Sequence, residues 1–264
     1  MLALPWAGAQ STVHEEGLVA YYPLDEGSGN VAHDRSSNAG HAKIVGAIWS
    51  KAEGRPVLEL DGDDDHLLCG DRPGLDLRGP WTLSIWVRPG DVPDAEVGLV
   101  GKHFSSYLLT YYKNGQAYAY VGGGGNHVTH AVAPHSWSHL AATFDGKKLR
   151  LFVNGQLAAE RESKFPRTPP GKALWIGCVV GDPAAPDPNA RATGFFEGAI
   201  AEVKVYSRAL SAHEVLGQYR ATAQRRFPPS TRAIYGVDGV VPTNNSVLIR
   251  RQGLARFDAQ ASRG

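Results

Sequence analysis

Four aspartates crowd into the segment 61–65, DGDDD, and Asp34 lies in a second turn-rich loop, AHDRSSNAG. The four are Asp61, Asp63, Asp64 and Asp65. Carboxylates this close repel one another unless water or a cation compensates their charge. Calcium suits such a place because it is a hard ion that takes several oxygen ligands, many of them from loop carbonyls. The order differs from that of an EF-hand loop, so the segment predicts either another kind of calcium site or a solvated acidic turn.

A second group of residues with chemical potential is tyrosine-rich. Asn114-Gly115 is typical of a two-residue hairpin turn, because both residues tolerate positive φ. That register sets Tyr111 opposite Tyr118. One face of the hairpin then carries the candidate ligand-binding residues, Tyr107, Tyr111, Tyr118 and Tyr120. Outward-facing rings would form a platform for stacking sugars, and inward-facing rings would pack in the interior.

The elements that must position these residues are short strands. Gly (31) and Pro (17) are plentiful in the 264 residues, and strand-like runs recur between turn residues from 17 to 206. This pattern predicts an all-β sandwich or barrel. The expected strands are Leu18–Leu24, Ala42–Trp49, Val57–Leu60, His66–Cys69, Thr82–Arg88, Val97–Lys102, Tyr107–Tyr112, Gln116–Val121, Ser138–Phe144, Lys148–Val153, Gln156–Glu162, Ala173–Cys178 and Phe195–Tyr206.

The sequence divides into three parts. Residues 1–12 look like the remnant of a signal peptide, because Ala7-Gly8-Ala9 has the small-x-small form of a cleavage site. Residues 13–225 hold the strands and one helix, which begins at the capping box Ser211-Ala-His-Glu214 and ends near Arg225. Residues 226–264 show no sustained periodicity, so we expect a linker or tail. The leader predicts a secreted or extracellular protein; the periplasm and the cell surface are alternative locations.

Composition excludes some classes of protein. The 27 Lys+Arg and 26 Asp+Glu give a net charge of +1, without the basic surplus that is typical of nucleic-acid binding. No apolar run approaches the roughly 20 residues that span a bilayer. The spacing of Cys69 and Cys178 fits no zinc motif, and both lie in apolar runs. They are either buried free thiols or the two halves of one disulfide.

Five segments carry a likeness to a known family. In chain order they are GLVAYYPLDEGSGNVAHDRSSNAGHA, LELDGDDDHLLC, WTLSIWVRP, WSHLAATFDGKKLRLFVNGQLAAE and FFEGAIAEVKVYSRALSAHEV. Together they resemble the laminin-G-like domains of the concanavalin A-like lectin/glucanase superfamily over about 17–222. The resemblance implies a jelly-roll sandwich of two antiparallel sheets with one short C-terminal helix.

The resemblance also implies a calcium site, since related domains often bind a structural calcium where the two acidic loops meet. By this resemblance Asp34 and Asp63 are the expected calcium ligands, and backbone oxygens near Asn38 and His41 would support them. Glu202 is a further candidate carboxylate from the closing strand. Ala201 stands where the family usually has Asp, which weakens the case for that strand.

Motifs of catalysis are absent from the sequence. There is no Glu-x-Asp-x-x-Glu strand of the related glucanases, no Gly-x-Ser-x-Gly elbow, no His-Glu-x-x-His and no P-loop. One alternative is catalysis by an acid and a base from distant strands, such as His103 with Tyr111 acting on a uronate. His127, His130 and His135 match no known metal-ligand spacing. The sequence assigns no catalytic residue and favours a protein that is not an enzyme.

These observations lead to one expected function and two alternatives. We expect a secreted, non-catalytic module with a structural calcium site that binds a polysaccharide, a glycoconjugate or a surface protein. One alternative is a polysaccharide lyase or glycoside hydrolase on the same jelly roll. The other is a structural adhesion or spacer domain beside a neighbouring domain.

Overall fold

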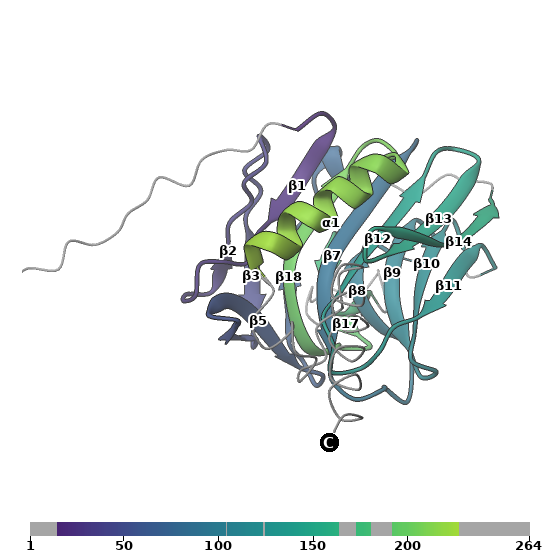
Figure 1. The fold of residues 1–264 in the computed structure, drawn as a ribbon. Coiled ribbons are helices and arrows are strands. Elements are labelled where there is room, and N and C mark those ends of the chain that lie inside the picture. The colour runs from purple at the N-terminus through teal and green to yellow at the C-terminus, as the bar shows by residue number, and fades with distance from the viewer. Residues whose placement is uncertain (1–14, 104, 124, 164–172, 181–191, 227–264) are drawn as a thin grey trace, which may run out of the picture.

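The chain forms a sandwich of two antiparallel sheets in a computed structural model that describes residues 15–103, 105–123, 125–163, 173–180 and 192–226 (Figure 1). Each sheet has eight strands. The expected all-β jelly-roll architecture is therefore confirmed. The expected leader, residues 1–12, lies outside the described residues, and so does the expected tail, residues 226–264, except for Arg226.

The first sheet, here the helix-covered sheet, has the order β14-β13-β12-β7-β18-β5-β4, with β1 also paired to β18. Its strands are β1 (Leu18–Tyr22), β4 (Ile48–Ala52), β5 (Arg55–Asp61), β7 (Trp81–Pro89), β12 (Ser138–Phe144), β13 (Lys148–Val153), β14 (Gln156–Glu162) and β18 (Glu197–Tyr206).

The second sheet, here the open sheet, has the order β11-β10-β9-β8-β15-β6-β3-β2. Its strands are β2 (Val31–Ala32), β3 (Ala42–Val45), β6 (His66–Leu68), β8 (Val97–Gly101), β9 (Tyr107–Tyr112), β10 (Gln116–Val121), β11 (His127–Ala131) and β15 (Trp175–Ile176). The remaining elements are the 3-10 turn η1 (Pro73–Leu75), the paired strands β16 (Val179–Val180) and β17 (Ala192–Thr193), and the helix α1 (Ala212–Arg226).

Strand β7 shows how the layers are held together. Leu83, Ile85 and Val87 alternate toward the core between the sheets and are fully buried. Trp86, on the opposite face, packs with Ala199, Ala201 and the ring of Tyr219 in α1. The helix thus lies across the outer face of this sheet, so both faces of β7 are buried (Figure 1).

The cap of α1 follows the expected capping box. The Ser211 backbone N–H donates to the Glu214 carboxylate at 2.8 Å, and the Glu214 N–H donates to Ser211 Oγ at 3.3 Å. The helix ends at Arg226, one residue beyond the expected boundary of the sandwich. None of the helices among the described residues is long and apolar enough to cross a membrane. Cys69 and Cys178 are both buried free thiols.

The predicted two-residue turn is confirmed at one of the two asparagine–glycine sites and is wrong at the other. At Asn154-Gly155 both residues have positive φ, 51° and 77°, and the expected pairing of Val153 with Gln156 is confirmed. In the β9–β10 hairpin only Gly115 has positive φ, and Tyr112 pairs with Gln116. The loop therefore holds three residues, and the two-residue prediction is wrong by one position.

That slip changes which tyrosines share a face, because successive side chains of a strand point to opposite sides of the sheet. Tyr118 lies opposite Thr110, and Ala117 lies opposite Tyr111. Tyr107 and Tyr111 consequently face the core, where they are 0% and 1% exposed. Tyr118 and Tyr120 lie on the outer face of the open sheet.

Candidate functional site

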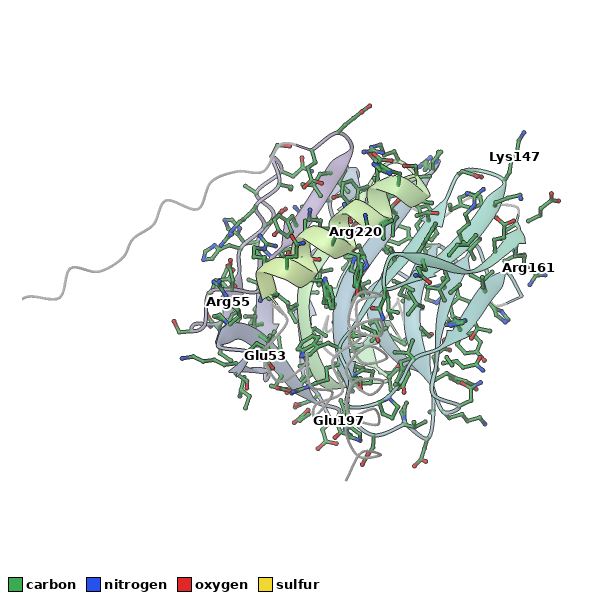
Figure 2. The ribbon with its side chains drawn as sticks, viewed as in Figure 1. Glu53, Arg55, Lys147, Arg161, Glu197 and Arg220 are labelled. Atoms are coloured by element: carbon green, nitrogen blue, oxygen red, sulfur yellow. The ribbon has the colours of Figure 1, made fainter. Side chains whose placement is uncertain are left out.

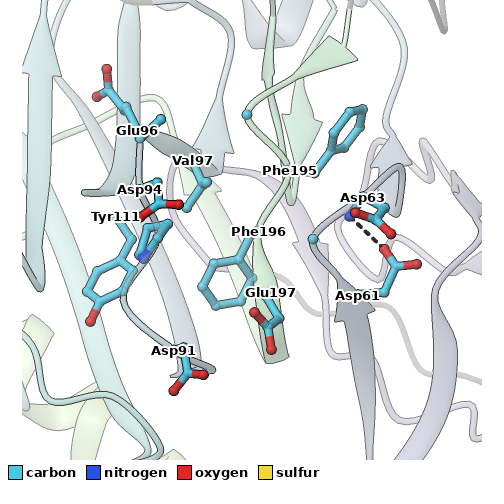
Figure 3. A pocket seen from close by; sticks show the side chains of 14 residues that line it. Asp61, Asp63, Asp91, Asp94, Glu96, Val97, Tyr111, Phe195, Phe196 and Glu197 are labelled. Carbon is cyan, nitrogen blue, oxygen red and sulfur yellow. Dashed lines mark hydrogen bonds between the residues drawn. The ribbon is translucent and has the colours of Figure 1, made fainter. Parts of the chain in front are cut away.

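An acidic cleft of about 380 Å³ lies at the end of the sandwich where three loops meet (Figure 3). The loops follow β5, join β7 to β8, and lead into β18. They supply six carboxylates, Asp61, Asp63, Asp91, Asp94, Glu96 and Glu197, and the described residues that line the cleft include no Lys, Arg or His. The cleft is therefore a concentrated negative surface on a chain whose net charge is only +1.

The inner wall of the cleft is apolar. Phe196 is fully buried and stands between the loops, with Val97 on one side (Figure 3). Tyr111 contributes its ring, while its hydroxyl donates to the Val132 carbonyl at 3.2 Å. An apolar wall below a carboxylate rim is the arrangement that ligand pockets use to combine area with orientation.

The protein's own donors engage part of the rim. The Asp63 N–H donates to Asp61 Oδ1 at 2.9 Å, and the Thr110 hydroxyl donates to Glu96 Oε1 at 2.7 Å. His135 Nε2 lies 3.1 Å from Asp91 Oδ1. That exposed contact is the only ion pair that the six carboxylates make among the described residues, so the cleft keeps most of its negative charge.

A group of rings, here the aromatic patch, lies on the outer face of the open sheet. It consists of Tyr112, Tyr118, Tyr120 and His127. Tyr118 and Tyr120 are stacked, with ring centroids 5.9 Å apart and planes 16° apart. Tyr112 meets Tyr118 edge-on at 5.4 Å, and His127 lies 5.2 Å from the Tyr118 ring. Tyr118, Tyr112 and His127 are half-buried, and Tyr120 is buried, at 8% exposure.

Glu96 links the cleft to the aromatic patch. Glu96 is among the residues that line the cleft, but its carboxylate points away from the other cleft carboxylates (Figure 3). This carboxylate accepts from Thr110 and lies beside the Tyr120 hydroxyl. Burial raises the pKa of Tyr120, and the hydrogen bond with Glu96 raises it further, so the hydroxyl stays protonated. A carboxylate next to stacked rings can accept hydroxyl groups of a ligand whose apolar face lies on the rings.

Two of the four expected ligand-binding tyrosines are therefore corrected. The Tyr107 hydroxyl donates to the Leu75 carbonyl at 2.7 Å inside the protein, and burial raises its pKa well above the usual value. Tyr111 is buried as well, so it forms no exposed pair with His103. Tyr118 and Tyr120 stay in the candidate site. Tyr112 and His127 join them. A three-residue loop in the hairpin would have revealed Tyr112, whereas His127 lies on β11, a strand that the sequence did not predict.

The expected calcium residue Asp34 is held by donors of the protein itself. The Asp34 carboxylate, with no exposed surface, accepts the backbone N–H groups of Tyr21 at 2.9 Å and Ser36 at 2.8 Å through one oxygen. Its other oxygen accepts the Gly40 N–H at 2.9 Å and Arg72 Nη1 at 3.2 Å. Both oxygens are thus engaged by donors of the protein, and these contacts organise the loop around Asp34.

The closing strand offers no free carboxylate either. Glu202 is 3% exposed and accepts Arg225 Nη2 and Arg226 Nε at 2.6 Å each. The Tyr21 hydroxyl also donates to Glu202, at 2.8 Å. Glu202 has positive φ (53°) at an irregularity of β18, which turns its side chain toward the end of α1. It therefore anchors the end of the helix.

The other three candidates, Asn38, His41 and Asp63, each have contacts within the protein. Asn38 Nδ2 donates to the Val19 carbonyl at 2.8 Å, and His41 Nδ1 accepts the Asp34 N–H at 3.1 Å. Asp63 belongs to the acidic cleft. Asp34 and His41 are thus in contact with each other, whereas Asn38 and Asp63 take part in other contacts.

Within DGDDD the carboxylates approach closely at three other positions. Oxygens of Asp61, Asp64 and Asp65 lie within 4.8 Å of one another. The Asp61 N–H donates to Asp65 Oδ2 at 3.0 Å. Burial raises the pKa of Asp65, and the charges of Asp61 and Asp64 raise it further. The close approach of carboxylates that the sequence predicted is therefore present within this segment.

Comparison with solved structures shows the same fold in carbohydrate-active proteins. Trypanosoma rangeli sialidase in complex with 2,3-difluorosialic acid matches with a TM-score of 0.60 and 18% identity over 77% of this chain, which spans 33% of that sialidase chain. Domain 4 of AbnA, a GH43 extracellular arabinanase from Geobacillus stearothermophilus, in complex with arabinotriose, matches with a TM-score of 0.57 and 18% identity. That match covers 77% of this chain and 98% of the arabinanase domain.

Sequence comparison gives the family. No curated protein matches the chain. Residues 61–216, more than half of the chain, match the family described as the concanavalin A-like lectin/glucanases superfamily. The match covers most of the strands and the start of α1. This protein therefore belongs to the laminin-G-like family of the concanavalin A-like lectin/glucanases superfamily.

Proposed function

We propose that this protein is a non-catalytic glycan-binding module whose site is the aromatic patch together with Glu96. The observation that carries the proposal is the position of the Glu96 carboxylate beside the stacked rings of Tyr118 and Tyr120. Sugar recognition needs both parts. Apolar ring area covers the C–H face of a sugar, and fixed polar groups orient its hydroxyls.

The contacts assign a role to each residue. Tyr118 is the half-exposed ring on which a sugar would stack, and Asn114 Nδ2 donates to its hydroxyl at 3.2 Å. Tyr120 stacks against that ring. Thr110 holds Glu96, which accepts hydroxyl hydrogens of the sugar as charge-assisted bonds.

The structural neighbours support this function without fixing the ligand. One is an arabinanase domain bound to arabinotriose, and another is a sialidase bound to a sialic acid derivative. We include extracellular placement in the proposal, on the basis of the small-x-small motif at Ala7-Gly8-Ala9.

A glycan array of neutral, amine-bearing and acidic oligosaccharides tests the proposal, with Tyr118→Ala as the test variant. Leu157→Ala on β14 is the matched control, because Leu157 is 51% exposed on a strand outside the site. We expect binding of at least one oligosaccharide by the wild type and the control, and its loss in Tyr118→Ala. Binding that survives Tyr118→Ala, or no binding by the wild type, overturns the proposal; the second result favours a spacer.

The carboxylates of the cleft favour a second candidate, a glycoside hydrolase, since glycosidases use paired carboxyl groups around the scissile bond. Release of reducing ends from polysaccharides on prolonged incubation measures it. Product that disappears in Glu197→Gln would establish an enzyme and overturn the non-catalytic assignment.

A further inference from the structure

The tripeptide Asn-Gly-Gln occurs twice in the chain, at 114–116 and at 154–156, and each copy lies at the turn of a β-hairpin. We propose that the first copy is a modification site, at which Asn114 deamidates by reaction with water in the folded protein, whereas the fold protects Asn154 in the second copy. Because the reacting residues are the same in both copies, their surroundings in the fold must make the difference.

The reaction takes place within the asparagine–glycine pair itself. The deprotonated backbone nitrogen of the glycine attacks the asparagine Cγ and closes a succinimide ring, and the side-chain amide group takes up a proton and leaves as ammonia. Water then opens one of the two ring C–N bonds, which gives aspartate or isoaspartate. A glycine allows this attack because it has no Cβ and its backbone adapts easily. The side chain and the turn must both rotate before the two atoms can meet.

Few contacts restrain the first copy. Asn114 is exposed, and among the described residues its side chain makes one hydrogen bond, a donation from Nδ2 to the Tyr118 hydroxyl at 3.2 Å. A Cβ built at Gly115 would stand 3.6 Å from its nearest neighbour, so the space around this glycine is open. The Gly115 N–H donates to the Tyr112 carbonyl at 2.8 Å, and the Gly115 carbonyl accepts the Val132 N–H at 2.9 Å. Of these two bonds, only the first engages the nitrogen that reacts.

The asparagine of the second copy is fixed to strand β12. Asn154 Oδ1 accepts the His139 N–H at 2.9 Å, and the Asn154 N–H donates to the His139 carbonyl at 2.8 Å. His139 is 1% exposed, so water has little access to replace these two bonds. The Asn154 side chain therefore cannot rotate toward the next nitrogen unless both bonds to β12 are strained or broken.

The glycine of the second copy is covered by α1, the helix that carries Arg220 in Figure 2. Gly155 is buried, and a Cβ built there would stand 2.9 Å from Leu216 Cδ1 and 3.1 Å from Tyr219 Cβ. Such close packing leaves the turn no room to change its dihedral angles while the helix is in place. Reaction at Asn154 thus requires that α1 move away from the hairpin.

Deamidation of Asn114 would alter the aromatic patch beside it. Either product lacks the amide donor to the Tyr118 hydroxyl and adds one negative charge at that point. Isoaspartate also adds a carbon to the main chain of the loop between β9 and β10. The length of this loop sets the register that places Tyr112 and Tyr118 on the same face.

Incubation of the native protein at mildly alkaline pH, followed by tryptic digestion and mass spectrometry, tests the proposal. Cleavage after Lys113 and after Arg150 places the two asparagines in separate peptides, so both rates come from one sample. Enzymatic methylation of isoaspartate measures that product independently. A second sample, unfolded in guanidinium chloride, gives the reactivity of both sites without the fold. Asn114→Gln keeps the amide on a longer side chain and should abolish the signal of the first site.

We expect Asn114 to react at least about tenfold faster than Asn154 in the native protein, because the buried hydrogen bonds and the packing of the second turn raise its barrier. Unfolding should bring the two rates together. Equal rates in the native protein, or a faster reaction at Asn154, overturn the proposal. An Asn114 that stays intact in the native protein also overturns it. So does a gap that persists unchanged in guanidinium chloride, because the preceding residues, Lys113 and Val153, would then set the rates.

Discussion

The Thr110 hydroxyl donates a 2.7 Å hydrogen bond to the Glu96 carboxylate, and this contact joins the outer face of a sheet strand to the acidic loop beside it. Thr110 is fully buried on β9, so its hydroxyl occupies a fixed position. Glu96 comes from the loop between β7 and β8. The pair fixes a carboxylate next to Tyr120 at the edge of the aromatic patch.

Thr110→Val should therefore weaken glycan binding with little effect on folding. Valine keeps the shape and removes the donor, and the half-buried Glu96 can recover hydration from solvent. We expect affinity for an oligosaccharide identified on the array to fall about fivefold, and the free energy of unfolding to change by less than about 1 kcal/mol. Calorimetry and denaturant unfolding measure the two effects. Unchanged affinity would remove Glu96 from the site.

Asp34 should stabilise the protein through its own hydrogen bonds and not through a metal. Removing one partner of its buried pair with Arg72 leaves charge and backbone donors unpaired. Asp34→Ala should lose on the order of 3–5 kcal/mol of unfolding free energy. Asp25→Ala is the control, because the Asp25–Arg35 pair is more exposed and is worth about 1 kcal/mol or less.

The metal question is then settled by repeating both unfolding experiments in excess EDTA. We expect the same difference in unfolding free energy between wild type and Asp34→Ala with and without chelator. If EDTA lowers the stability of the wild type to that of the variant, Asp34 acts through a cation after all.

The end of α1 should depend on Glu202. Arg226 is 3% exposed, donates to Glu202 at 2.6 Å, and also donates to the Pro56 and Pro23 carbonyls. Arg226→Met leaves the buried Glu202 with fewer partners, so the unfolding free energy should fall by about 3 kcal/mol. Arg220→Met, on the exposed side of the same helix, should change it by less than about 0.5 kcal/mol. Equal effects of the two substitutions would contradict the anchoring role.

His139 should make the protein sensitive to acid. Burial lowers the pKa of His139 from 6.5 to about 3, with a smaller contribution from the charge of Lys204. Between these values the unfolded chain binds a proton that the folded chain excludes, so stability falls as pH drops below 6.5. The slope from this residue is about 1.4 kcal/mol per pH unit. This slope should be absent from His139→Gln. Unfolding free energies of the wild type and the variant, measured from pH 7 to pH 4, test the prediction. Parallel curves for the two proteins would contradict it.

Much of the fold follows from local patterns in the sequence. Tyr107–Tyr112, Gln116–Val121, Ser138–Phe144, Lys148–Val153 and Gln156–Glu162 have the bounds that period-two alternation predicts. Other elements depend on tertiary contacts that alternation does not record. The run Ala42–Trp49 divides at Gly46, which has positive φ (75°) and lies against Asp65. Strand β11 is polar and was not expected, because pairing with β10 defines it.

The site was harder to predict than the fold. Asn114-Gly115 is compatible with both two-residue and three-residue loops, and one residue of slip exchanges the two faces of the hairpin. Asp34 and Glu202 were expected as metal ligands on their type, but their partners, Arg72 and Arg226, lie far away in sequence. The role of Glu96 depends on the approach of a loop to β9, for which the sequence carries no local signal.

The central claim is that sugar binds on the outer face of the open sheet, at the aromatic patch and Glu96. Backbone amide chemical shifts, followed while the protein is titrated with an oligosaccharide identified on the array, test it most directly. The account predicts saturable changes at Glu96, Tyr118, Tyr120 and His127, and none on α1. Saturable changes confined to α1 or the helix-covered sheet, with the aromatic patch unmoved, would contradict it.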